Sequence, residues 1–225
     1  MSDSELLSMP TYGMAQVDRI LRLGTGTARR WIDGYERDGH YYLPVVREEP
    51  TGNDVVTWGE FVEASFLARY RNSGVPMRRM RPVVERLRTE FKSQYPLAEL
   101  RPFAQGKELL MEIQTEIGLE QQMLLVVVRT NQIVLTDRAQ QFHDSVTWSK
   151  QRKRVAKSMV LVDSAQSVTV DPLVAFGEPA VRSIRTDILA SSYRAGDSVE
   201  DLAVGYSLDL AEVNDALRYE LSIAA

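Results

Sequence analysis

The chain has 225 residues, of which 44% are hydrophobic and 26% are charged, a balance typical of a folded globular protein with room for two small domains. It contains no cysteine, which excludes disulfides and thiolate metal sites, and it contains only two histidines. Its first ten residues lack the pattern of a signal peptide, and no apolar run reaches about 18 residues. We therefore expect a cytoplasmic protein without a membrane span.

The net charge of -4 is distributed unevenly along the chain. Residues 1–100 hold 14 basic and 14 acidic side chains, residues 101–157 hold 9 and 6, and residues 158–225 hold 4 and 11. Phosphates repel the acidic C-terminal third, whereas the rest of the chain is compatible with them. We therefore expect the two ends of the chain to contact different partners.

The N-terminal region has the element order of a winged helix-turn-helix. Residues 14–23 and 25–37 each place apolar side chains on one helical face, and glycines separate the two segments. Residues 44–47 and 54–57 are short β-type runs around a turn sequence at residues 50–53, which predicts the wing. This order predicts a DNA-binding unit.

Two more helices are predicted after the wing. Thr57 and Glu60 form a capping box that opens a helix through Asn72. Gly74 and Pro76 end that helix and start another, which has an apolar face opposite an arginine-rich face. Both helices belong to the predicted head of the chain.

The middle of the chain, residues 93–170, gives weaker signals. Residues 122–129 form an apolar run that fits a buried strand paired with residues 132–136, and a buried helix is the alternative. Residues 149–157 are basic and predict an exposed connector before a strand at residues 159–162. We predict a middle region that contains β structure.

The C-terminal part predicts a three-helix unit. Helices are expected over residues 186–195, 198–204 and 209–221, because capping-box pairs open the last two and Gly196 and Gly205 end the first two. The expected core residues are Ile188, Leu189, Leu202, Leu210, Val213 and Leu217.

The predicted fold class is therefore mainly α with a smaller β component (α+β). We predict a winged helix-turn-helix at residues 11–92, a β-containing middle at residues 93–170 and a three-helix bundle at residues 171–225. The helical modules at the two ends differ in charge, which fits a protein with two partners.

Residues 11–92 resemble the MerR-type winged helix-turn-helix. Thr-Ala-Arg-Arg-Trp at residues 27–31 fits the start of its second helix, and Gly-Val-Pro at residues 74–76 fits the break between its last two helices. Arg22 replaces the family's usual turn glycine, which implies a looser turn. The resemblance implies binding to double-stranded operator DNA.

The C-terminal segment is similar to a small bacterial antitoxin domain. Its FGxP motif is present at residues 176–179, and its AGDS and DLAxxY motifs are present at residues 195–198 and 201–206. Ser183 replaces the usual turn glycine of that domain, which puts the conformation of the connector in question. A MerR-like head joined to this tail resembles VapB-like antitoxins, whose partner is a PIN-domain ribonuclease toxin.

This second resemblance implies an antitoxin that neutralises the toxin and represses the shared promoter. Prokaryotic helix-turn-helix proteins usually bind palindromic operators as dimers, so a homodimer is expected. The alternative is a stand-alone MerR-type regulator that responds to a small effector. That alternative expects a long dimerising helix, whereas the last helix of the head is predicted to stop near Phe91.

The predicted helices and the two resemblances indicate candidate contact residues. Arg29 and Arg30 stand where a recognition helix reads bases, and the other basic residues are candidates for phosphate contacts. A solvated polar surface is the alternative for each. The candidate DNA-binding residues are Thr25, Thr27, Arg29, Arg30, Arg47, Arg78, Arg79 and Arg81. The candidates for contact with a toxin or a second subunit, on the acidic last helix, are Glu212, Asp215 and Tyr219.

Motifs of catalysis are missing from the sequence. There is no GxGxxG, P-loop, HExxH or GxSxG motif, and the pair His143 and Asp144 is of a kind that is usually incidental. We therefore expect no enzymatic activity, no cofactor and no metal.

Overall fold

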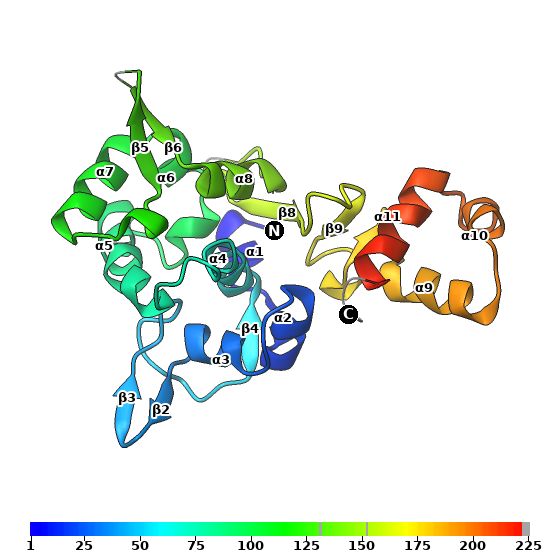
Figure 1. Ribbon diagram of the computed structural model, residues 1–225, viewed down its shortest axis with the longest axis horizontal. Helices are drawn as coiled ribbons and strands as arrows, with labels where there is room; N and C mark the ends of the chain where they lie inside the picture. The colour runs from blue at the N-terminus through cyan, green and yellow to red at the C-terminus, as the bar shows by residue number, and fades with distance from the viewer. Residues whose placement is uncertain (131, 152, 222–225) are drawn as a thin grey trace. The chain divides into compact units, whose positions relative to one another are not determined.

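The computed structural model describes residues 1–130, 132–151 and 153–221. The chain divides into two compact units, Met1–Ala156 and Lys157–Ala225. Helices dominate both units and short strands make up a smaller part, so the predicted α+β fold class is confirmed (Figure 1).

The first unit begins with a head that has the predicted order of helices. Its elements are α1 (Asp3–Leu7), β1 (Pro10–Gly13), α2 (Met14–Ile20), α3 (Thr27–Ile32), β2 (Tyr35–Arg37), β3 (His40–Tyr42), β4 (Val55–Thr57), α4 (Trp58–Ala68), the 3-10 helix η1 (Met77–Met80) and α5 (Arg81–Phe91). Strand β1 pairs antiparallel with β4, and β2 pairs antiparallel with β3. Helix α3 is shorter than predicted because the chain enters β2 only three residues after it ends.

The wing lies at a different place from the predicted one. Strands β2 and β3 form a hairpin that projects beyond α3 (Figure 1). Asp38 and Gly39 join them with φ of 52° and 70°, the left-handed geometry of a tight hairpin turn. Residues 44–47 form no strand, and β4 pairs with β1 instead, so the predicted wing around residues 50–53 is wrong.

Helix α4 is the core helix of the first unit. Ten of its eleven residues are buried, as expected for a helix that is surrounded by protein. The capping box of Thr57 and Glu60 is confirmed, with both of its hydrogen bonds formed. The rings of Phe66 and Phe142 meet edge to face with centroids 5.0 Å apart, which ties α4 to the end of the unit.

The remainder of the first unit contains more helix than predicted. Its elements are η2 (Pro96–Ala98), α6 (Arg101–Ala104), α7 (Lys107–Glu116), η3 (Gln121–Met123), β5 (Val126–Arg129), β6 (Gln132–Leu135), α8 (Asp137–Ser145) and β7 (Val146–Trp148). Strands β5 and β6 pair antiparallel, so the predicted hairpin is confirmed and the helical alternative is wrong. The first strand begins only at Val126 and Val128 is 62% exposed, so it is shorter and less buried than predicted. In the predicted basic connector, Lys150, Lys153 and Arg154 are exposed, and Arg152 lies outside the described residues.

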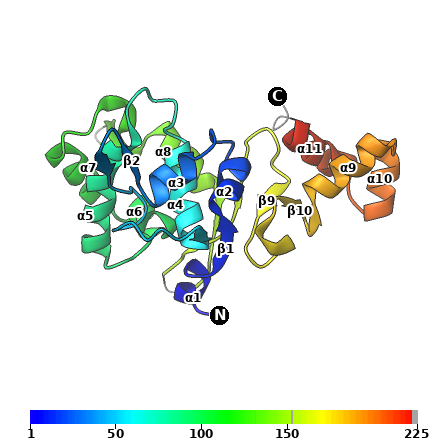
Figure 2. The ribbon, with the colours of Figure 1, turned by 90° about the horizontal axis from the view of Figure 1, so that it is seen from below.

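The second unit combines short strands with three helices (Figure 2). Its elements are β8 (Ala156–Val160), β9 (Val168–Val170), the 3-10 turn η4 (Ala175–Gly177), β10 (Ala180–Val181), β11 (Ile184–Arg185), α9 (Thr186–Ala195), α10 (Val199–Tyr206) and α11 (Leu210–Leu221). The strands follow the order β11-β10-β9-β8 and neighbouring strands are antiparallel.

The three predicted C-terminal helices are confirmed, with one corrected end. Gly196 ends α9 in a left-handed conformation with φ of 113°. Gly205 does not end α10, which continues for one more residue until Ser207 takes the left-handed cap with φ of 55°. Four of the six predicted core residues lie in the core, namely Leu189, Leu202, Val213 and Leu217.

Two predicted core residues of this unit lie at the surface. Ile188 is 43% exposed and Leu210, the first residue of α11, is 49% exposed. Tyr219, which was predicted to contact a partner, is instead only 1% exposed and packs into the core. The burial of Tyr219 therefore contradicts a contact role for its side chain.

Candidate nucleic-acid interface

Asp18 on α2 fixes the start of α3. Its Oδ2 accepts a hydrogen bond from the Gly26 N–H at 2.6 Å, and its Oδ1 accepts one from the Ala28 N–H at 2.7 Å. A carboxylate is favourable there because the first N–H groups of a helix lack intrahelical partners. Asp18 is not recognisable as a cap from the sequence, because the helix that it caps starts nine residues later.

The turn between α2 and α3 keeps the geometry expected with a glycine. Arg22 has φ of 54°, the left-handed conformation that glycine adopts most readily. The side chain of Arg71 donates to the carbonyl groups of Leu21 and Arg22 and so covers this turn. The looser turn that the replacement of glycine implied is therefore not found.

Three candidate residues, Thr27, Arg29 and Arg30, lie in α3, and a fourth, Thr25, lies in the turn before it. Arg30 and Thr25 are exposed, and an Nη of Arg30 donates to the hydroxyl of Thr27 at 2.8 Å. The Arg29 side chain is 42% exposed and forms an ion pair with Asp54. Thr27 and Arg30 therefore lie on one side of the helix, and Arg30 is the more accessible of the two arginines.

Arg78 and Arg79 lie beside the wing. The guanidinium of Arg78 stands over the ring of Tyr42 in β3, 5.5 Å from its centroid, and Tyr42 stacks on Tyr35 with centroids 4.7 Å apart. Arg79 is exposed and approaches Glu120 at 3.7 Å. The structure thus brings these two arginines together with the wing.

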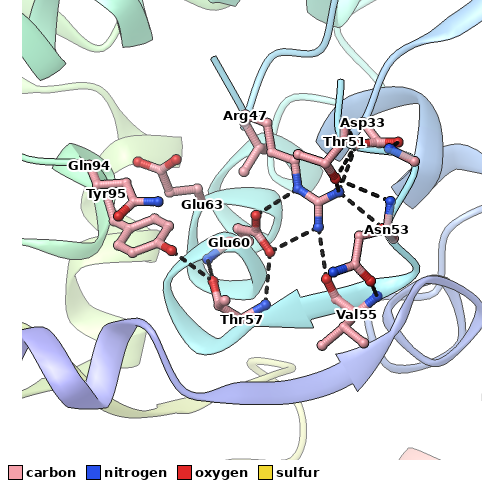
Figure 3. Close-up of polar contacts among 12 residues, drawn as sticks. Asp33, Arg47, Thr51, Asn53, Val55, Thr57, Glu60, Glu63, Gln94 and Tyr95 are labelled. Atoms are coloured by element: carbon pink, nitrogen blue, oxygen red, sulfur yellow. Dashed lines mark hydrogen bonds and ion pairs between the residues drawn. The ribbon is translucent and has the colours of Figure 1, made fainter. Parts of the chain in front are cut away.

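Arg47 points into the head, as Figure 3 shows. Its side chain is 9% exposed, its Nε donates to Glu60 Oε1 at 2.7 Å, and its Nη1 donates to Asp33 Oδ1 at 2.7 Å. The same guanidinium also donates to Thr51 Oγ1 at 2.6 Å and to the Val55 carbonyl at 2.8 Å. Because its donors are used internally, Arg47 is not placed to contact phosphate, in contrast to the sequence prediction.

Asp33 is the second centre of this buried network. It follows α3 as the C-cap and accepts hydrogen bonds from the Thr51 N–H at 2.7 Å and the Gly52 N–H at 2.9 Å. Burial opposes ionisation of Asp33, but the bonds from Thr51, Arg47 and Gly52 outweigh it and hold its pKa below the ordinary value. The network therefore ties α3 to the loop before β4 and to Glu60 on α4.

Arg81 is also used internally. Its Nη2 donates to the Glu48 carbonyl at 2.9 Å, its Nη1 donates to the Pro44 carbonyl, and its Nε lies 2.7 Å from Glu85 Oε1. Only 15% of its side chain is exposed. Arg81 therefore holds the loop after β3 against α5 and, like Arg47, is not placed to contact phosphate.

Glu63 and Arg88 form a second buried pair in the head. Arg88 Nη2 lies 3.7 Å from Glu63 Oε2, and Glu63 Oε1 accepts a hydrogen bond from the Leu97 N–H at 3.0 Å. Burial raises the pKa of Glu63 to about 8, although the charge of Arg88 acts in the opposite direction. Among the described residues, Glu63 Oε2 and Arg88 Nη1 have no hydrogen-bond partner.

The two acidic candidates on α11 are engaged within the second unit. Glu212 Oε2 accepts from the Asp209 N–H at 2.8 Å and its Oε1 accepts from Arg182 Nε at 3.0 Å. The bond from the Asp209 backbone and the bond from Arg182 lower the pKa of Glu212. Asp215 accepts from the Ser167 N–H at 3.0 Å and pairs with an arginine one turn along the helix. Both carboxylates therefore stabilise the unit itself.

Two family models match the two ends of the chain. The model described as "Putative DNA-binding HTH domain" matches residues 10–84, which include α2, α3 and the wing. The model described as "Protein of unknown function (DUF433)" matches residues 168–219, which include α9, α10 and most of α11.

Two proteins of Mycobacterium tuberculosis are similar to nearly the whole chain. "Uncharacterized protein Rv2308" is 37% identical over 97% of this chain and 93% of its own length. The chain belongs to the Rv2308 family. "Putative antitoxin VapB45" is 25% identical over 96% of this chain and 97% of its own length.

A solved structure shares the fold of this chain. The crystal structure of Rv2018 from Mycobacterium tuberculosis superposes with a TM-score of 0.74 at 21% sequence identity. The match covers 93% of this chain and 97% of the solved chain. In the part of the chain that the structure describes, no helix has the length and apolarity to cross a membrane.

Proposed function

We propose that the chain is a DNA-binding antitoxin that neutralises a PIN-domain ribonuclease toxin and represses the promoter of the pair as a homodimer. The observation that carries the proposal is a helix-turn-helix with exposed polar residues on α3 in a chain that is similar, over nearly its whole length, to a protein named as an antitoxin. The difference in charge between the two ends of the chain supports separate DNA and protein partners.

Helix α3 is the proposed recognition helix. Its N-terminal residues are the ones that a helix-turn-helix presents to the major groove. Arg30 is exposed and already oriented by Thr27, so its planar guanidinium is available for bidentate contact with guanine. Arg29 can exchange its partner Asp54 for a phosphate or a base, and Thr25 lies in the preceding turn. We therefore assign base reading to Arg30 first.

The wing surface is the proposed site of phosphate contacts. Arg78 and Arg79 are exposed, and both lie beside β3. Phosphate contacts fix the position of a protein on DNA without reading sequence. Each contact contributes about -0.9 to the slope of log affinity against log salt concentration. Replacing either arginine with alanine should therefore make the slope shallower by that amount.

The test combines toxin and DNA binding. The full chain is co-expressed with the product of the adjacent reading frame, and the complex is assayed for ribonuclease activity and for binding to the promoter fragment. Arg30→Ala should weaken promoter binding while leaving toxin inhibition intact. Arg129→Ala, which removes an exposed arginine of the β5–β6 hairpin, is the matched control and should change neither. A wild-type chain that binds neither toxin nor promoter contradicts the proposal.

A cavity in the head supports a second candidate function, regulation by a small effector. The cavity has a volume of about 700 Å³ and is lined by residues of the loop before β4 and of the end of α5, including Arg88, Lys92 and Glu49. Arg88 has an unpartnered Nη1 among the described residues, and Lys92 supplies a second cation. Calorimetric titration with succinate and with inorganic phosphate tests this function. Binding that Lys92→Ala abolishes supports it, and no heat with either anion contradicts it.

A further inference from the structure

The loop between β9 and β10 presents an aromatic side chain to solvent. Phe176 is 91% exposed, the largest exposed fraction among the described large hydrophobic residues. Leu173, three residues earlier in the same loop, is 55% exposed. Two large apolar side chains that stay exposed contribute no burial free energy to folding. Neighbouring exposed apolar side chains of this kind can mark a binding site.

The loop has a strained, hydrogen-bonded backbone where it carries Phe176. Ala175, Phe176 and Gly177 have φ of 50°, 57° and 77°, three successive left-handed residues of which only one is glycine. The Gly177 N–H donates to the Val174 carbonyl at 2.9 Å, and the Glu178 N–H donates to the Ala175 carbonyl at 3.1 Å. Left-handed residues with side chains are unfavourable and persist where the surrounding structure enforces them, often at binding sites.

Buried residues on both sides hold the loop in place. Pro172 and Pro179 are buried, and the Pro179 carbonyl accepts from the Thr186 N–H at 2.9 Å. The Leu173 N–H donates to Asp171 Oδ1 at 2.9 Å. The exposed aromatic ring is thus carried by a fixed backbone, which limits the conformational entropy that binding through it would cost.

We propose that Phe176, flanked by Leu173, is the anchor with which the second unit binds an apolar pocket of a basic partner protein. This rests on the proposed function, in which that partner is the toxin. Rigid aromatic side chains at the centre of an interface commonly contribute most of the binding energy. The loop around the anchor also carries the half-buried carboxylates of Asp171 and Glu178, with Arg182 beside them.

Charge selects the partner among the possible occupants. Residues 158–225 hold 4 basic and 11 acidic side chains, so phosphates are repelled and a second copy of this unit brings the same charge. A partner with a basic surface is instead attracted and its association is accelerated. A second copy and a DNA base step remain distinguishable outcomes of the test.

The test uses the full chain and the purified product of the adjacent reading frame. Phe176→Asn removes the ring and keeps a residue type that tolerates the left-handed backbone, so the melting temperature should stay the same or rise. The Kd for the toxin should increase roughly 30-fold or more, the effect of losing an interface hot spot. Val204→Ser is the matched control, because Val204 is 82% exposed on α10 of the same unit. It should change the Kd by less than about twofold.

Each other result has a defined meaning. A wild-type complex that Phe176→Asn leaves unchanged overturns the anchor and leaves the antitoxin function standing. A wild-type chain that forms no complex overturns the antitoxin function and the anchor with it. Loss of the homodimer in sedimentation experiments, or loss of promoter binding with toxin binding intact, overturns the proposal in favour of a second copy or of DNA.

Discussion

Helix α3 and the loop before β4 both carry arginines that the sequence assigns to DNA, yet the structure uses them in opposite ways. Arg30 on α3 is exposed, whereas Arg47 in the loop is 9% exposed and bonded to Asp33 and Glu60. The difference comes from the carboxylates nearby, because the end of α3 and the start of α4 supply two acids that face the loop. A basic residue in a DNA-binding head therefore indicates a DNA contact only when it forms no ion pair with a buried carboxylate.

Arg47→Ala should give the largest effect, because it leaves two carboxylates buried without their cation. Removing one partner of a buried ion pair costs about 3–5 kcal/mol. We expect a clear fall in melting temperature and the loss of promoter binding together. Arg129→Ala is the control, since the Arg129 side chain is 61% exposed on the β5–β6 hairpin, outside the proposed DNA-contact residues. If the Arg47→Ala chain unfolds at the wild-type temperature and only its DNA binding is weaker, Arg47 contacts DNA and has no structural role in the head.

Arg30→Ala should show the opposite pattern to Arg47→Ala. Loss of a bidentate contact with a base costs about 1–3 kcal/mol of discrimination. Affinity for the cognate promoter should fall toward that for unrelated DNA, while the free energy of unfolding stays within about 0.5 kcal/mol of wild type. Fluorescence anisotropy with both DNA fragments and urea unfolding measure these quantities. Equal weakening on both fragments would assign Arg30 to a phosphate instead of a base.

The sequence predicts the helices of this protein better than its contacts. Capping boxes such as Thr57 with Glu60 and the glycine at position 196 are local signals, and both are confirmed. The position of the wing is hard to predict because β2 and β3 carry no aliphatic residues, so that only the Asp38-Gly39 turn signals the hairpin.

The internal roles of charged residues depend on contacts that are distant in sequence. Arg47 meets Asp33 and Glu60, which lie 14 residues before it and 13 residues after it. Tyr219 becomes a core residue because α11 packs against α9 and the strands of its unit. Residue type and spacing along one helix do not show which distant residues will pack against it. The burial of Arg47 and Tyr219 therefore becomes visible only in the folded structure.

Asp18→Ala tests whether the buried carboxylate of Asp18 positions the exposed side chains of α3. Loss of a side chain that caps a helix N-terminus costs about 0.5–2 kcal/mol. The unfolding free energy should fall by that amount, and promoter affinity should fall as well because the start of α3 carries Thr27, Arg29 and Arg30. Asp18→Asn keeps an acceptor for one of the two N–H groups and should recover part of both losses. Unchanged promoter affinity at reduced stability would show that α3 keeps its place without the cap.

Glu63→Gln should give the smallest effect, and its sign should depend on pH. Because burial raises the pKa of Glu63 to about 8, the folded chain holds a proton that the unfolded chain releases near the ordinary pKa of about 4.3. The stability that this proton contributes is complete below that ordinary value and is lost as pH rises through about 8. Glu63→Gln should therefore flatten the fall in melting temperature between acidic and mildly alkaline pH, with Glu90→Gln on the exposed face of α5 as the control. A pH profile identical to wild type would mean that Glu63 stays ionised because the charge of Arg88 offsets the cost of burying its carboxylate.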